Sequence, residues 1–184
     1  MSLCVDKVRG MNGAMQSALI VSIPEAEEAV ALHRAQFDDA AAFGIPAHVT
    51  VLFPFMPPSQ VNAHVIGTLA AAISTVPRFD ATFESTGWFG TNVLWLAPKP
   101  AAVFGALTTA VADAFPDYPP YGGEHEEVIP HLTVGHDVAG SELQEAEAGV
   151  LTCLPIRANV TEVALWCGTD VPAGWRRMMG FPLG

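Results

Sequence analysis

Residues 46–55, PAHVTVLFPF, predict a short β-strand with two different faces. Successive side chains of a strand point to opposite sides of a sheet. His48 and Thr50 therefore share one face, while Val49 and Val51 share the other. We expect the valine face to pack on the core and the other face to present an imidazole beside a hydroxyl.

The same pattern returns in residues 129–135, IPHLTVG, where His131 follows His48 by 131 − 48 = 83 positions. His131 and Thr133 share one face of the predicted strand, with apolar residues on the opposite face. About 0.1 motifs of the form histidine–apolar–threonine–apolar are expected by chance in such a chain. Two occurrences are therefore a specific signal. Each predicts a rigid strand that presents a titrating imidazole beside a hydroxyl that donates hydrogen bonds.

The segments around the two motifs alternate between strand-like and helix-like patterns. Predicted strands cover residues 18–23, 48–53, 79–85, 93–96, 131–134, 156–167 and part of 174–184. Predicted helices cover residues 24–38, 59–75, 100–115 and 141–151. This order is typical of the α+β class with largely antiparallel sheets.

The two halves of the chain share one plan, because each contains a helix, a proline-rich loop and a short histidine-bearing strand. This repetition predicts a bilobal fold with two related lobes. Residues 1–16 show no periodicity and are expected to form a loose N-terminal extension. Residues 17–184 then form a single domain.

The chain carries 8 Lys and Arg against 19 Asp and Glu, a formal net charge of −11. Lysine and arginine supply most of the affinity for long duplex nucleic acid, so partners of that class and anionic membrane surfaces are excluded. With 51% apolar residues the chain is compact, yet it has no run of about 18 apolar residues that predicts a membrane span. No signal peptide or cysteine framework is present, so we expect a cytoplasmic monomer with reduced thiols.

The two motifs, the LFPF run at residues 52–55 and the closing FPLG at residues 181–184 resemble the two-histidine (2H) phosphoesterase superfamily, particularly its 2'-5' RNA ligase-like branch. The resemblance covers residues 17–184. It implies two antiparallel sheets with flanking helices, in lobes related by a pseudo-twofold axis around a central cleft. It implies no cofactor and no metal.

The resemblance also implies hydrolysis of a cyclic phosphodiester, of the 2',3'-cyclic phosphate type, on a small nucleotide or an RNA end. His48 and His131 would act as general acid and base, in an order that the sequence leaves open. Thr50 and Thr133 would donate hydrogen bonds to the phosphate oxygens. Two alternatives remain, namely joining of RNA ends through a 2'-5' linkage and a non-catalytic nucleotide- or phosphate-binding module.

Two further residues are candidates for substrate binding. Tyr121, in the loop before the second motif, has a ring on which a base can stack, and Arg157, on the predicted strand 156–167, can bind a phosphate. The acidic composition is expected to favour one protonated histidine near neutral pH. We expect the strand of His131 to end at Gly135 and His136 to face away, which argues against a metal site.

Overall fold

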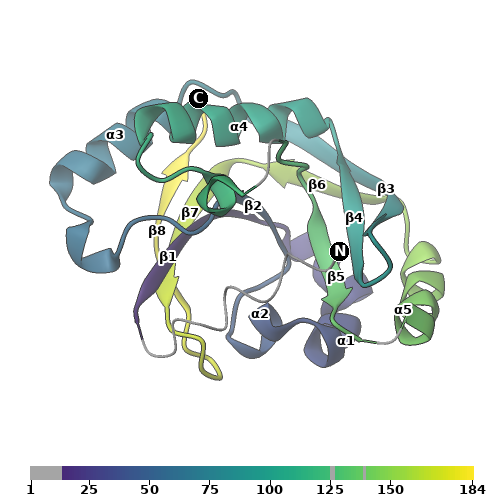
Figure 1. Ribbon diagram of the computed structural model, residues 1–184. Coiled ribbons are helices and arrows are strands. Elements are labelled where there is room, and N and C mark those ends of the chain that lie inside the picture. Colours follow the sequence, from purple (N-terminus) through teal and green to yellow (C-terminus); the bar gives the residue numbers. More distant parts are fainter. Residues whose placement is uncertain (1–13, 125–126, 139) are drawn as a thin grey trace.

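The computed structural model describes residues 14–124, 127–138 and 140–184 and consists of two four-stranded antiparallel sheets with flanking helices (Figure 1). The first sheet has the order β2-β1-β7-β8, with β1 (Gln16–Ser22), β2 (His48–Leu52), β7 (Glu162–Gly168) and β8 (Arg176–Pro182). The second has the order β5-β4-β3-β6, with β3 (Phe79–Phe89), β4 (Val93–Lys99), β5 (Leu132–His136) and β6 (Ile156–Val160). The predicted α+β class and antiparallel sheets are confirmed.

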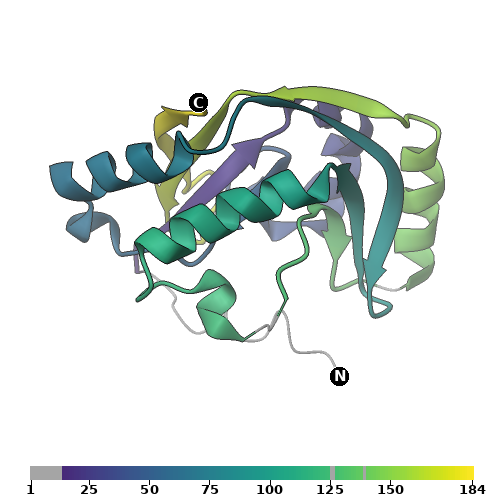
Figure 2. The ribbon, with the colours of Figure 1, turned by 90° about the horizontal axis from the view of Figure 1, so that it is seen from above.

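Five α-helices flank the two sheets in the part of the chain that the structure describes. They are α1 (Glu27–Phe37), α2 (Asp39–Ala42), α3 (Ala63–Ile73), α4 (Ala101–Ala114) and α5 (Gly140–Leu151). Short 3-10 turns lie at η2 (Pro24–Ala26), η3 (Pro58–Gln60) and η4 (Pro120–Gly123). Helices α3 and α4 pack against each other along the top of the molecule in Figure 1, and α4 crosses the middle of the view from above (Figure 2).

The prediction of one long strand over residues 156–167 was wrong. The chain leaves the second sheet after Val160 and enters the first sheet at Glu162. We call the first and the second sheet, each together with the helices that follow its strands in the chain, the first and the second lobe. Strands β6 and β7 therefore belong to different lobes. Ile156 and Ala158 are buried in one piece, and Val163 and Leu165 in the other, so the alternation shifts by one residue where the chain changes sheet. The prediction of a single strand overlooked this shift.

The predicted helix over residues 24–38 begins as a 3-10 turn and its α-helical part, α1, ends at Phe37. Asp38 takes an extended conformation, and its carboxylate accepts a hydrogen bond of 3.0 Å from the Ala40 backbone N–H. Aspartate at this position caps the next short helix, α2, which the sequence did not predict. The chain therefore changes direction at Asp38, whose side chain is buried.

The two motif strands, β2 and β5, are edge strands of different sheets, and they contact each other. Helix α1, which follows β1 of the first lobe, packs on β5 of the second lobe. Helix α4, which follows β4 of the second lobe, packs on β2 of the first. Each lobe therefore covers the motif strand of the other, and the two motifs are held together by packing from both sides.

A hydrophobic core runs through both lobes directly behind the motifs. Its motif residues are Val49, Val51, Leu132 and Val134, each at most 2% exposed. Full burial of such a side chain contributes about 1.5–3 kcal/mol, so the polar faces of β2 and β5 rest on rigid packing.

No helix among the described residues is long and apolar enough to cross a membrane. Strand β1 begins at Gln16, the last residue of the predicted extension. Residues 1–13 of that extension lie outside the described residues.

Candidate active site

The two motifs occupy matching positions in their sheets. His48 is the first residue of β2 and His131 directly precedes β5. In both motifs the histidine and the threonine are partly exposed, while the apolar residue between them is buried. The predicted alternation of faces is therefore confirmed.

Both imidazole rings are oriented by the same local hydrogen bond. The Nδ1 atom of His48 lies 2.8 Å from the Pro46 carbonyl oxygen, and Nδ1 of His131 lies 2.7 Å from the Ile129 carbonyl oxygen. A carbonyl oxygen only accepts, so Nδ1 carries the proton in each ring. In the neutral form Nε2 then holds the lone pair, and both rings are set to accept or return a proton at Nε2.

Aromatic rings surround His131. Phe89 meets the imidazole edge to face with the ring centroids 4.9 Å apart, and the Trp95 ring lies 6.1 Å away. Trp95 is the cross-strand neighbour of Thr133 and stacks on Phe89 at 5.0 Å. The second motif thus has an apolar aromatic wall.

A buried ion pair lies near His48 instead. Arg34 Nε donates to Asp38 Oδ2 at 2.8 Å, and Arg34 Nη2 donates to the Ile45 carbonyl oxygen at 3.1 Å. Both side chains are buried, with 2% and 4% of their surface exposed. The sequence analysis identified neither residue as part of the site, although their i, i+4 spacing on a predicted helix was a signal of contact.

Both histidine pKa values are lowered. Burial, and then the positive charge of Arg34, bring the pKa of His48 to about 4, against the Pro46 hydrogen bond and the Asp38 charge, which raise it. Burial also lowers the pKa of His131, against the hydrogen bond to Ile129. The expectation of one protonated histidine near neutral pH was wrong, because desolvation outweighs the acidic surroundings.

The sequence matches the 2'-5' RNA ligase superfamily over residues 22–170, most of the chain. This chain belongs to that superfamily. The resemblance drawn from the two motifs is thereby confirmed. No curated protein matches the chain significantly.

Solved structures of other proteins share the architecture of this superfamily member. E. coli LigT in its apo form has 19% identity and a TM-score of 0.58, over 93% of this chain and 99% of LigT. Its complex with 3'-AMP has 19% identity and a TM-score of 0.54, over 92% and 98%. The protein TT0787 of Thermus thermophilus has 18% identity and a TM-score of 0.57, over 91% and 97%. At these identities the likeness shows the fold.

The two candidate substrate-binding residues lie in different surroundings in this superfamily member. Tyr121 is half-buried in η4, and its backbone N–H donates to the Phe53 carbonyl oxygen at 2.7 Å, just beyond the end of β2. Its φ of 52° lies in the left-handed region, which costs about 1–3 kcal/mol for a residue with a side chain. The loop before the second motif is thus held against the first motif strand.

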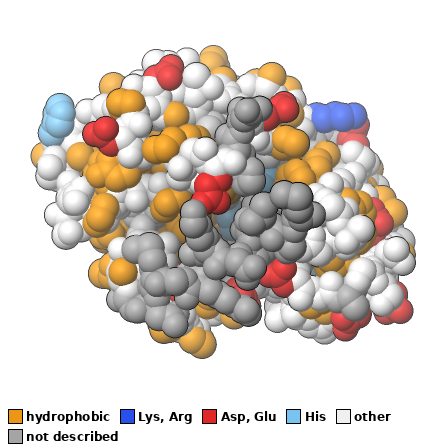
Figure 3. Space-filling model, viewed as in Figure 1, with side chains coloured by type: hydrophobic (Ala, Val, Ile, Leu, Met, Phe, Trp, Pro, Cys, Tyr) orange, Lys and Arg blue, Asp and Glu red, His pale blue; other side chains and the backbone are white. Residues whose placement is uncertain are grey.

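Arg157 is exposed on β6, the edge of the second sheet opposite to β5. The hydrogen bond and charge of Lys99, at 2.8 Å, lower the pKa of Glu84, and the charge of Arg157 adds a smaller effect in the same direction. The structure does not bring Arg157 to the histidine pair. Figure 3 shows histidine side chains near the centre of one face, whereas Lys and Arg side chains appear at its upper right margin.

Strand β5 does not end at Gly135, as the sequence predicted, but continues to His136. An irregularity in its pairing with β4 lies between Leu94 and Trp95, and Val134 and Gly135 are both buried. The bulge shifts the alternation by one residue, so His136 returns to the partly exposed face of Thr133. Among the described residues no group of three or more His, Cys, Asp or Glu is arranged to hold a metal ion.

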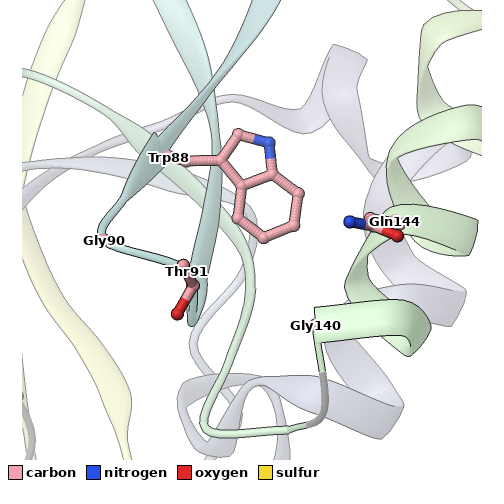
Figure 4. A pocket seen from close by; sticks show the side chains of 5 residues that line it. All are labelled: Trp88, Gly90, Thr91, Gly140 and Gln144. Carbon is pink, nitrogen blue, oxygen red and sulfur yellow. The ribbon is translucent and has the colours of Figure 1, made fainter.

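A hollow of about 180 Å³ opens between the β3–β4 turn and the start of α5 (Figure 4). Its lining is Trp88, Gly90, Thr91, Gly140 and Gln144. None of these groups titrates near neutral pH, and neither motif contributes to the lining. The hollow is therefore separate from the candidate active site of this superfamily member.

Proposed function

We propose that this protein is a metal-independent phosphoesterase that hydrolyses a 2',3'-cyclic phosphate on a nucleotide or an RNA end. The observation that carries the proposal is the duplicated site. Two histidines with the same Nδ1 hydrogen bond stand beside two threonines, on two edge strands that contact each other. This arrangement supplies two positioned proton-transfer groups and two hydroxyl donors.

His48 is the general base in this mechanism. Its pKa of about 4 leaves the ring neutral at neutral pH, with the Nε2 lone pair free to take a proton from water. Arg34 favours this neutral state, and its charge is not among the groups that act on His131. The unequal surroundings of the two rings support His48 as the base and His131 as the acid.

His131 is the general acid. The water oxygen forms a bond to phosphorus, and the bond from phosphorus to one ribose oxygen breaks. The water proton passes to His48 Nε2, and the proton on His131 Nε2 passes to the departing ribose oxygen. Because an anionic phosphate near a histidine favours its charged form, substrate binding raises the pKa of His131 and loads it with this proton.

Thr50 and Thr133 donate hydrogen bonds to the non-bridging phosphate oxygens, where charge builds in the transition state. Each side chain lies on the same face as its histidine, and both are partly exposed. Their hydroxyls replace the lysine and arginine groups that phosphate sites often contain. This neutral donor set fits a chain with a net charge of −11.

The substrate is small. A net charge of −11 opposes the binding of long nucleic acid. The E. coli LigT structure with 3'-AMP supports a nucleotide-sized ligand for a protein of this fold. The family description favours ligation through a 2'-5' linkage as a second candidate, which is the same ring opening with a ribose 5'-hydroxyl in place of water as the nucleophile.

The test is a screen of 2',3'-cyclic nucleotides and short RNAs that end in a cyclic phosphate, with phosphorus NMR to assign the product. We expect turnover that EDTA leaves unchanged and that His48→Ala and His131→Ala each reduce strongly. His64→Ala, an exposed change on α3, is the matched control. Full activity of the double variant, or loss of activity with EDTA that added metal restores, contradicts the proposal. Binding of a nucleoside 3'-phosphate without any turnover favours the binding module.

A further inference from the structure

A chain of three polar side chains crosses between the lobes beside the active site. Arg34 and Asp38 come from α1 and its end, in the first lobe, and form the buried pair described above. The other carboxylate oxygen, Asp38 Oδ1, lies 3.5 Å from His136 Nε2 on β5, in the second lobe. Asp38 thus contacts both lobes at once.

Asp38 is held in place from several directions. Oδ2 accepts from Arg34 Nε at 2.8 Å, while Oδ1 accepts from the Ala40 backbone N–H at 3.0 Å and faces His136. Its side chain is 4% exposed. Hydrogen bonds and opposite charges keep the pKa of Asp38 below its ordinary value despite burial, which raises it. The carboxylate is therefore a fixed negative charge.

His136 is bound at both ring nitrogens. Nε2 faces Asp38, and Nδ1 lies 3.2 Å from Asp137 Oδ2. The Asp38 hydrogen bond raises the pKa of His136, opposed by burial and assisted by the charges of Asp38 and Asp137. The ring is 20% exposed and lies five residues beyond His131 on the same segment. The contacts of His136 with Asp38 and Asp137 therefore also restrain the segment that carries His131 and Thr133.

The charged groups that act on His48 come from both lobes. Arg34 and Asp38 act from α1, with opposite signs, and His131 acts from the second lobe. The buried pair is therefore both a mechanical support for β5 and part of the electrostatic surroundings of His48.

We propose that Asp38 and His136 are positioning residues, whose contact joins α1 of the first lobe to β5 of the second and fixes His131 and Thr133 in register with His48. This inference rests on the proposed function for its catalytic consequence. Neither residue needs to touch the substrate. Productive geometry for proton transfer tolerates displacements of only about 0.5 Å, so loosening this contact lowers turnover more than it weakens binding.

The first experiment compares His136→Ala with His136→Gln, since glutamine retains an N–H donor for Asp38. We expect His136→Ala to lower kcat about 10-fold or more with a smaller change in KM, and His136→Gln to restore most of the loss. His64→Ala, which is exposed on α3, is the control for loss of a histidine. Equal losses in the alanine and glutamine variants, or a loss confined to KM, overturn the positioning role.

The second experiment needs no substrate and compares Asp38→Asn with Glu84→Gln by NMR titration of the imidazole of His136. Glu84 forms an ion pair of the same length as Arg34–Asp38, 2.8 Å, with Lys99, but in an exposed place. We expect the His136 titration to move to lower pH in Asp38→Asn, because the hydrogen bond and charge of Asp38 raise the pKa of His136, and to stay in place in Glu84→Gln. An unmoved His136 titration in a folded Asp38→Asn variant overturns the inference.

The outcomes of the two proposals are separable. A wild-type protein that hydrolyses no cyclic phosphate contradicts the proposed function, while the titration still tests the contact at Asp38. If Asp38→Asn fails to fold, His136→Gln and His136→Ala, in which the Arg34–Asp38 pair is intact, carry the same test through the His131 titration. In that case we expect His136→Ala to alter the His131 titration and His136→Gln to leave it close to wild type.

Discussion

The two lobes present the same motif in different surroundings. His48 in the first lobe lies near a buried ion pair, whereas His131 in the second lobe lies among aromatic rings. The local backbone bond at Nδ1 is the same in both. The comparison teaches that the motif orients each ring while its neighbours set its proton affinity, and unlike neighbours are what the proposed roles of base and acid require.

The helices that cover the two motif strands also differ in the kind of side chain that they bring to the strand. Asp38, at the end of α1, faces His136 of β5, whereas α4 brings apolar side chains to the interface with β2. The buried residues of α4 are Phe104, Leu107, Thr108 and Val111. The interface of α1 with β5 therefore includes a directional ionic contact, and the interface of α4 with β2 is largely apolar and holds the strands by burial.

The largest expected effect is loss of either histidine. His48→Ala and His131→Ala should each lower kcat by about 10²- to 10⁴-fold, because each removes one proton-transfer group. The pH profiles of the wild type and of the weakly active variants separate the two roles. The acidic limb should disappear in His48→Ala and the basic limb in His131→Ala. Loss of the basic limb in His48→Ala and of the acidic limb in His131→Ala contradicts the assignment of the base to the first lobe and the acid to the second.

The threonine pair should behave symmetrically. Thr50→Val and Thr133→Val keep the shape and strand propensity of the side chain but remove the hydroxyl. Each should lower kcat by about 10²-fold, the effect of removing one donor to a developing charge. Steady-state kinetics on a cyclic nucleotide measures the loss. A tenfold or greater inequality between the two variants shows that one lobe alone carries the phosphate contact.

The aromatic wall of the second lobe depends on Gly87. A Cβ atom at Gly87 would meet the ring of Trp95, the cross-strand neighbour of Thr133. Gly87→Ala should therefore destabilise the fold by about 1–3 kcal/mol, as overpacking does. Gly67→Ala, in α3 where a Cβ atom meets nothing within 4 Å, should instead stabilise it slightly. Denaturant unfolding checks both, and an unchanged midpoint in Gly87→Ala contradicts the tight packing of this wall.

The smallest effect is a pH dependence of stability. The pKa of His48 falls from 6.5 to about 4 on folding, so between these values the unfolded chain binds a proton that the folded protein does not. Stability is therefore complete above about pH 6.5 and is lost as the pH falls toward 4. Because His48 is partly exposed, the loss should be on the order of 1 kcal/mol. Thermal unfolding of His48→Gln should show a shallower dependence, and an equal slope in both proteins contradicts the lowered pKa.

Local sequence patterns predicted most of the elements and the core of the site. The alternation in the two motifs identified the strands of His48 and His131 and the faces that Thr50 and Thr133 occupy. The patterns failed where the chain passes from one sheet to the other and where a bulge interrupts the strand pairing. Residues 156–167 belong to two sheets and their alternation shifts where the chain changes sheet, and the bulge in β5 turned His136 to the face of Thr133.

The electrostatic surroundings of the site were not predictable from the sequence. Arg34 and Asp38 precede the first motif by more than one helical turn, and His136 belongs to the other half of the chain. Their contact depends on α1 packing on β5 of the opposite lobe. Composition alone suggested a protonated histidine, but the buried position of both rings produced the opposite shift.

The sequence by itself determined the α+β class, the two histidine–threonine strands and the net charge of −11, since these follow from side-chain periodicity and composition. Only the tertiary structure decided that β2 and β5 meet, that each lobe covers the other's motif strand, and that the two histidines differ. The physical reason is the distance along the chain over which each property is set. Periodicity reports which way a side chain points within its own element, whereas a pKa depends on burial and on charges that distant segments bring into contact.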